Sequence, residues 1–115
     1  MLFSEALKLN HVFQRLYRRG HSAANRYLVV YCRQNGTNGN RIGFTVSKKL
    51  GCAVVRNRAR RRLRECYRLN EWRLKPGYDV VVVARSRCTE APFGKLEAAF
   101  LSAAASLGIV KENIQ

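Results

Sequence analysis

Acidic residues are scarce in this 115-residue chain, and they are missing from most of its first half. The chain has 22 Lys and Arg but only 7 Asp and Glu, a formal net charge of +15 at pH 7, and no acid lies between residues 6 and 64. Repulsion between like charges destabilises a compact fold. A surface that served only solubility would therefore mix acidic and basic residues. The distribution therefore predicts a polyanionic partner, with nucleic acid favoured over an anionic membrane surface.

Long apolar runs and closely spaced cysteines are lacking as well. The longest apolar stretches, 80–84 and 98–107, fall far short of the roughly 20 residues that cross a bilayer, so we expect no membrane span. The N-terminus has no basic segment ahead of its apolar residues, which argues against a signal peptide and favours a cytoplasmic protein. The four cysteines include no Cys-x-x-Cys pair, so we expect buried or half-buried free thiols rather than a metal site.

The chain has the length and the 47% hydrophobic content of one compact domain, without a repeat or a linker. Apolar periodicity predicts helices at 10–19, from 52 or 53 towards 71, and at 92–107. It predicts strands at 27–33, 41–48 and 78–85, with a possible short strand near 22–25. The Asn-Gly pairs between the first two of these strands favour antiparallel neighbours, and the unbroken apolar run of the last favours burial on both faces. The order αββαβα predicts a single-domain α+β sandwich, residues 1–115, in which a mixed sheet packs against helices.

The densest feature is residues 56–64, which hold six arginines in nine positions inside the second predicted helix. A narrow apolar stripe on this helix, suited to packing on a sheet, would consist of Val55, Ala59, Leu63 and Cys66. Solvated helix faces normally carry compensating acids four residues away, but the first acid of this helix is Glu65. Guanidinium groups also bind phosphate in a planar, bidentate way, so the opposite face predicts contacts with nucleic acid. Its members are Asn57, Arg60, Arg61, Arg64 and Arg68.

Residues 46–58 read VSKKLGCAVVRNR, and the pattern continues through Arg61 and Leu63-Arg64-Glu65. This run closely resembles the signature of the bacterial ribonuclease P protein subunit, and the resemblance spans about residues 9–108. The resemblance implies that the Arg-rich helix lies in a left-handed βαβ crossover, although roughly 98% of such crossovers are right-handed. It also implies a protein cofactor of ribonuclease P, an endonuclease whose catalytic RNA performs the Mg²⁺-dependent hydrolysis that removes the 5′ leader of precursor tRNA.

The resemblance and the basic helix face together predict two sets of binding residues. The set expected to contact the catalytic RNA is Lys48, Lys49, Arg56, Asn57, Arg58, Arg60, Arg61, Arg64 and Arg68. The set expected to line a cleft for the single-stranded leader is Phe13, Tyr17, Val29, Tyr31 and Arg85. Rings can stack on bases of any sequence, but aromatic residues at helical spacing are more often part of the core, so both interpretations stay open.

Two residues depart from the family pattern. Cys52 stands where Asn is common, which removes a possible polar contact at the start of the helix. Arg62 stands where an aliphatic residue is common, and it either snorkels along the apolar stripe or adds a phosphate contact.

No side chain of this protein is predicted to be catalytic. His11 and His21 could serve as acid and base, but no supporting groups accompany them. The basic half lacks carboxylates, so we expect no protein-held metal and Mg²⁺ bound mainly by RNA phosphates, with a supporting site at Asp79 left open. The expected partners are the ribonuclease P RNA and precursor tRNA, with no membrane and no DNA, and the protein alone is expected to be monomeric.

Two other classes of protein share these features. A structural RNA-binding protein of ribosomal type would have the same charge and size, but its binding would not depend on a leader. A DNA-binding module would insert the arginine helix into a major groove, although this helix has few Asn or Gln side chains to read bases.

Overall fold

The computed structural model of the protein describes residues 4–6 and 10–111. The elements are β1 (Ser4–Ala6), α1 (Asn10–Arg19), β2 (His21–Ala24), β3 (Leu28–Gln34), β4 (Asn40–Thr45), α2 (Ala53–Asn70), β5 (Tyr78–Ala84) and α3 (Phe93–Ser106). Short 3₁₀ turns lie at Lys48–Leu50, Glu71–Arg73 and Ser86–Thr89. The three predicted helices and three predicted strands are present, and the possible short strand is β2. Strand β1 was not predicted, because three residues are too few to show the alternation of apolar and polar side chains that marks a strand.

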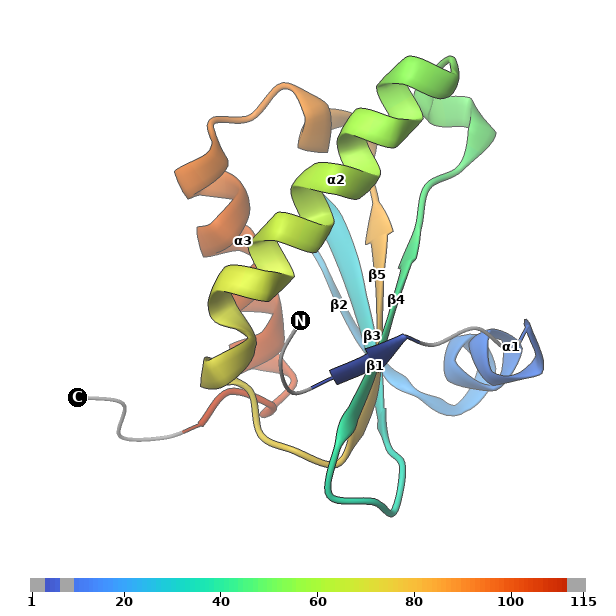
Figure 1. The fold of residues 1–115 in the computed structure, drawn as a ribbon, viewed down its shortest axis with the longest axis vertical. Helices are drawn as coiled ribbons and strands as arrows, with labels where there is room; N and C mark the ends of the chain where they lie inside the picture. Colours follow the sequence, from blue (N-terminus) through green and yellow to red (C-terminus); the bar gives the residue numbers. More distant parts are fainter. Residues whose placement is uncertain (1–3, 7–9, 112–115) are drawn as a thin grey trace.

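The strands form one sheet in the order β1-β4-β5-β3-β2, with β5 at its centre (Figure 1). Strand β5 pairs antiparallel with β3 and parallel with β4. The prediction that β3 and β4 are neighbours is therefore wrong. Strand β5 is the most apolar strand and takes the place between them, where helices cover both faces. The loop after β3 passes the start of β5, and the Asn35 N–H donates to the Gly77 carbonyl at 2.9 Å.

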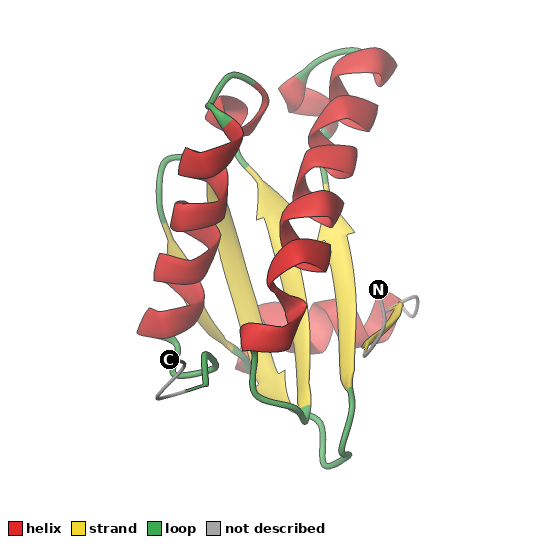
Figure 2. Cartoon of the chain, turned by 60° about the vertical axis from the view of Figure 1, so that its left-hand side comes forward, coloured by secondary structure: helices red, strands yellow, loops and turns green. Residues whose placement is uncertain are grey.

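Helices cover the sheet on both sides. Figure 2 shows α2 and α3 side by side on one face and α1 on the other. In that view β4 and β5 both point upwards, and α2, in front of the sheet, carries the chain from β4 leftwards to β5. This crossover is left-handed, as the family resemblance implied and as general rules of chain topology would not have predicted.

The main core lies between the sheet and the pair α2 and α3. Tyr67 of α2 packs edge-on against Phe44 of β4 and Phe100 of α3, with ring centroids 6.1 Å away in both cases. A smaller cluster lies on the other face, where Leu16 of α1 covers Val81 of β5. Each such fully buried side chain contributes on the order of 1.5 to 3 kcal/mol, so both faces of the sheet stabilise the fold.

All four cysteines are free thiols, as expected, and three of the four are also buried. Cys32, Cys66 and Cys88 are buried, and burial raises the pKa of the Cys66 thiol to about 12. Cys52 is exposed, contrary to the expectation, because it precedes the first turn of α2 and lies outside the apolar stripe. Among residues 4–6 and 10–111, no helix is long and apolar enough to cross a membrane.

Gly20 lets α1 end directly against β3. Its N–H donates to the Leu16 carbonyl at 2.9 Å, and a Cβ at this position would lie 2.6 Å from the Leu16 oxygen and 2.9 Å from the Cys32 oxygen. Both neighbours are backbone atoms, which cannot move aside without shifting the helix or the strand.

We predict that Gly20→Ala lowers the free energy of unfolding by about 1 to 3 kcal/mol, because a side chain is forced into filled space. Urea denaturation followed by circular dichroism measures this change. Gly94→Ala is the control, since nothing lies within 4 Å of a Cβ at Gly94, in the first turn of α3. Equal stability of the Gly20 variant and the wild type would contradict the predicted clash.

Candidate nucleic-acid interface

The apolar stripe of α2 faces the sheet and its basic face points outwards, as predicted. Ala59, Leu63 and Cys66 are buried, and Val55 is half-buried. The residues on the outer face are Asn57, Arg58, Arg61, Arg64 and Arg68, all exposed, and the half-buried Arg56 and Arg60 flank them. The narrow stripe thus anchors a helix that directs most of its arginines into solvent.

These arginines differ in how firmly the protein itself holds them. Within the described part of the chain, Arg58, Arg61 and Arg64 have no hydrogen-bond or ion-pair partner. Arg60 donates from Nη1 to Asn57 Oδ1 at 3.2 Å. Arg68 donates to both carboxylate oxygens of Glu65, which raises the pKa of Arg68 and lowers the pKa of Glu65. Arg58, Arg61 and Arg64 are therefore the arginines most available to an external phosphate.

Lys48 and Lys49 extend this surface at the start of α2. They lie in the 3₁₀ turn after β4, where Ser47 Oγ accepts from the Lys49 N–H at 3.1 Å, and both are exposed. Cys52 follows at the N-cap of α2. The pKa of its thiol is lowered, first by the backbone N–H groups of Val55 and Val54 at the helix start and less by the charge of Arg56. The same N–H groups and positive charges favour any anion at this end of the helix.

Arg62 packs against the protein and is only partly exposed to solvent. It is half-buried and donates from Nη2 to the carbonyl of Ala91, and its guanidinium lies 6.0 Å from the ring centroid of Phe93. Neither predicted role describes this contact, because the guanidinium group bonds within the protein, and a phosphate contact stays a prediction. This arginine joins α2 to the segment that precedes α3.

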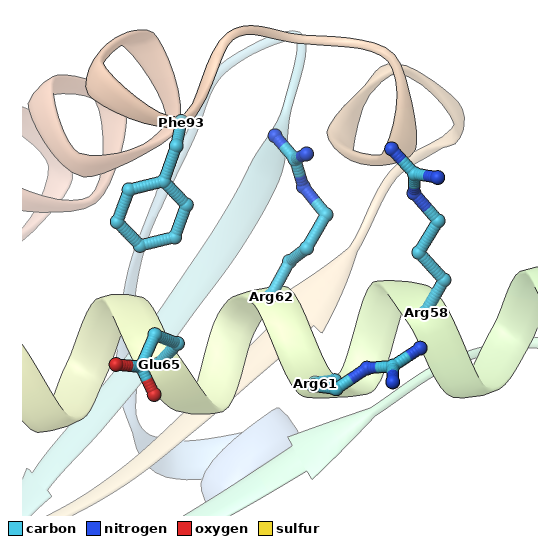
Figure 3. A pocket seen from close by; sticks show the side chains of 5 residues that line it. All are labelled: Arg58, Arg61, Arg62, Glu65 and Phe93. Carbon is cyan, nitrogen blue, oxygen red and sulfur yellow. The ribbon is translucent and has the colours of Figure 1, made fainter.

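Two hollows lie on either side of Arg61. One is lined by Arg58, Arg61, Arg62, Glu65 and Phe93 and has a volume of about 470 Å³ (Figure 3). The other is lined by Val54, Asn57, Arg60, Arg61 and Arg64 and has about 460 Å³. Phe93 was not among the predicted site residues. It comes from α3, and no pattern in the sequence indicates which part of α2 it meets.

The predicted cleft residues gather on the opposite face of the sheet, around α1. The rings of Tyr17 and Tyr31 meet edge-on with centroids 5.0 Å apart, and the hydroxyls of Tyr17 and Thr45 lie 3.3 Å apart. Tyr17 is 40% exposed, whereas Phe13 and Tyr31 are half-buried. These rings therefore pack on the sheet and also present a surface to solvent, so the core and the binding interpretations of these aromatic residues coexist.

The remaining cleft residues lie along β3 and just beyond β5. Val29 is half-buried and pairs with Val83, which packs on the Leu16 cluster. Arg85 follows the end of β5, is exposed, and donates from Nη1 to the Asn25 carbonyl at 3.2 Å. Neither Val83 nor Thr45 was predicted as a site residue, because aliphatic and hydroxyl side chains in an apolar strand carry no signal of binding.

The described residues do not form a metal site. Within 4–6 and 10–111, no three His, Cys, Asp or Glu side chains lie close enough to hold an ion. The oxygens of Asp79 accept from Arg41 at 2.7 and 2.6 Å and from Asn35 Nδ2 at 3.1 Å, so this carboxylate joins β4, β5 and the loop after β3. His21 is exposed at the start of β2, and the side chain of His11 lies outside the described part.

Comparison with known proteins agrees with the sequence signature. The family model described as Ribonuclease P matches residues 1–108. The "Ribonuclease P protein component" of Alkaliphilus oremlandii is 41% identical over 108 residues, 94% of this chain and 95% of the relative. That of Alkaliphilus metalliredigens is 45% identical over 101 residues, 88% of this chain and 91% of the relative.

Solved structures agree in fold. The ribonuclease P protein of Staphylococcus aureus superposes with a TM-score of 0.81 and 33% identity, covering 92% of this chain and 97% of that one. The protein from Thermotoga maritima superposes with a TM-score of 0.77 and 32% identity, covering 85% of this chain and 93% of that one. The chain therefore belongs to the family of bacterial ribonuclease P protein components, the protein cofactors of a tRNA-processing endoribonuclease.

Proposed function

We propose that this protein binds the catalytic RNA of ribonuclease P through α2 and, with that RNA, removes the 5′ leader of precursor tRNA in the cytoplasm. The observation that carries the proposal is the outer face of α2, where Arg58, Arg61 and Arg64 are exposed and have no partner within the described residues. Guanidinium groups with all donors free can each engage a phosphate in bidentate fashion. Lys48 and Lys49 add two exposed charges at the start of the same helix.

Hydrolysis is assigned to the RNA rather than to the protein. The exposed side chains of the α2 surface are mainly arginines, which stay protonated and cannot act as a base. Mg²⁺ prefers oxygen ligands, and the described residues offer no cluster of carboxylates there, so RNA phosphates are expected to hold it. The protein would supply positive charge where RNA strands crowd together, and so lower the repulsion that opposes metal and substrate binding.

The aromatic residues around α1 are proposed to form a cleft that holds the single-stranded leader. Stacking on Tyr17, Tyr31 and Phe13 would tolerate any leader sequence, as a processing enzyme for many precursors requires. Thr45, beside the Tyr17 hydroxyl, lies three residues before Lys48, so the cleft and the basic segment adjoin along the chain. Mature tRNA lacks a leader and would bind less tightly, which separates substrate from product.

The ribosomal and DNA-binding alternatives find no support in the comparisons, which match ribonuclease P proteins. They also differ in what they predict. A structural RNA-binding protein would bind its RNA without any effect of leader length, and a DNA-binding module would prefer duplexes of particular sequence.

The first prediction concerns cleavage at low Mg²⁺. Adding the protein to a bacterial ribonuclease P RNA is expected to raise the rate of precursor cleavage and to lower the Mg²⁺ concentration that half-maximal activity requires. Gel analysis of labelled precursor measures both quantities, with and without the protein. An unchanged rate and an unchanged Mg²⁺ requirement would contradict the proposed function.

The second prediction concerns the free arginines of α2. Arg58→Ala or Arg61→Ala is expected to weaken assembly with the RNA and to reduce the slope of log K against log salt by about 0.7 to 0.9 for each phosphate that the variant no longer neutralises. Lys111→Ala is the control, since it removes one exposed charge beside Arg73, past the C-terminal end of α2. Filter binding across a salt series measures the slopes, and a slope equal to that of the wild type would place these arginines in free solvent.

The third prediction concerns the cleft. Tyr17→Ala is expected to weaken binding of precursor tRNA to the holoenzyme by about 1 to 3 kcal/mol, the usual contribution of one stacked base, and to leave binding of mature tRNA unchanged. Tyr17→Phe, which keeps the ring and removes only the hydroxyl beside Thr45, is the matched control. Equal weakening for precursor and mature tRNA would show that the ring does not contact a leader.

A further inference from the structure

The hollow between α2 and the start of α3 contains an aromatic ring, Phe93, as well as arginines, and phosphate contacts alone do not explain that ring. Figure 3 shows Arg58 and Arg62 extending from α2 towards the segment before α3, with the Phe93 ring on the side of Arg62 away from Arg58. Two of its walls thus come from segments about 30 residues apart in the chain. Its volume of about 470 Å³ falls within the range of small-molecule sites, although it is open to solvent.

The inner part of the hollow is held firmly in place. Phe93 is half-buried, packs against the main core and begins α3 directly after Pro92. Arg62 lies over its ring at 6.0 Å and is tied to the Ala91 carbonyl. A flat aromatic ring and a flat guanidinium therefore stand preorganised at the surface, so a ligand would not have to order them on binding.

The outer part of the hollow is positively charged and free. Arg58 and Arg61 line it, are exposed and have no partner within the described residues. Glu65 also lines it, but both of its carboxylate oxygens accept from Arg68, which offsets its charge. A ligand that is flat and apolar on one side and anionic on the other would match this arrangement.

We propose that this hollow receives one unpaired base of the RNA partner, stacked against Phe93 and Arg62, with its flanking phosphates on Arg58 and Arg61. The inference rests on the proposed function, since it takes the ribonuclease P RNA as the partner, and it adds a base-binding site to a surface otherwise assigned to phosphates. Proteins commonly recognise RNA in this way, because unstacked bases in loops and bulges can be splayed out onto aromatic rings or guanidinium planes. A paired base could not enter, since its faces are covered by its neighbours.

The test compares Phe93→Leu with the wild type in binding to the ribonuclease P RNA. The variant is expected to bind about 5- to 150-fold more weakly, the equivalent of one stacked base, with an unchanged salt slope because every phosphate-binding side chain is kept. Phe93→Tyr and Phe93→Trp, which restore a ring, are expected to restore the affinity. This pattern differs from that of the Arg58 and Arg61 variants, in which the salt slope falls.

Phe44→Leu is the matched control for effects on folding. Phe44 is also half-buried and packed on the core, but it meets Tyr67 beneath α2 and lines neither of the two hollows beside Arg61. The inference would be overturned if Phe93→Leu bound the RNA like the wild type, or if its affinity fell no further than that of Phe44→Leu.

Chemical probing of the RNA gives a second readout that does not depend on protein stability. Reagents that modify exposed base edges and faces are expected to reveal one nucleotide protected by the wild-type protein and left reactive by Phe93→Leu at saturating concentration. Identical protection patterns would overturn the inference. If the wild-type protein itself failed to bind the RNA, the proposed function would fail as well, so the two failures are distinguishable.

Discussion

The position of β5 in the middle of the sheet, covered on both faces, is the constraint on which the rest of the structure depends. Its side chains alternate between two cores: Val80 and Val82 face α2 and α3, and Val81 faces α1. One strand therefore supports the basic helix on one side of the sheet and the cluster of Phe13, Tyr17 and Tyr31 on the other. Because β5 lies within both packing layers, neither surface can shift without disturbing the other.

The second constraint is electrostatic. Helix α2 carries a dense series of arginines, and the fold holds them together by anchoring the helix through a narrow stripe that includes Ala59 and Leu63. Few acids compensate this charge, and Glu65 is paired with Arg68 towards the C-terminal end of the helix. The positive charges in the first turns of α2 and on Lys48 therefore repel one another without compensation. The phosphates of an RNA backbone would relieve this repulsion. The proposed affinity for RNA and the charge repulsion within the folded protein thus have the same origin.

Predictions from the sequence succeeded where a signal is local. The helices and the solvent-facing side of α2 follow from the 3.6-residue period of a helix, which is set by backbone geometry. That Tyr17 lies near Tyr31 was implied only by the family resemblance, because no local period relates a helix residue to a strand residue. Prediction failed for the order of the strands, because Asn-Gly pairs mark a turn but do not state which strand lies beside which. It also failed for Cys52, whose exposure depends on where α2 begins relative to the sheet.

By itself, then, the sequence determined the class of the fold and the family, since these depend on composition, periodicity and one long motif. Only the tertiary structure decided which arginines stay free. Arg62 packs on Phe93, about 30 residues further along the chain, whereas Arg58 and Arg61 remain available to a ligand. The physical reason is that a side chain's partners are set by its distance to residues remote in the chain, and those distances exist only once the helices have packed on the sheet.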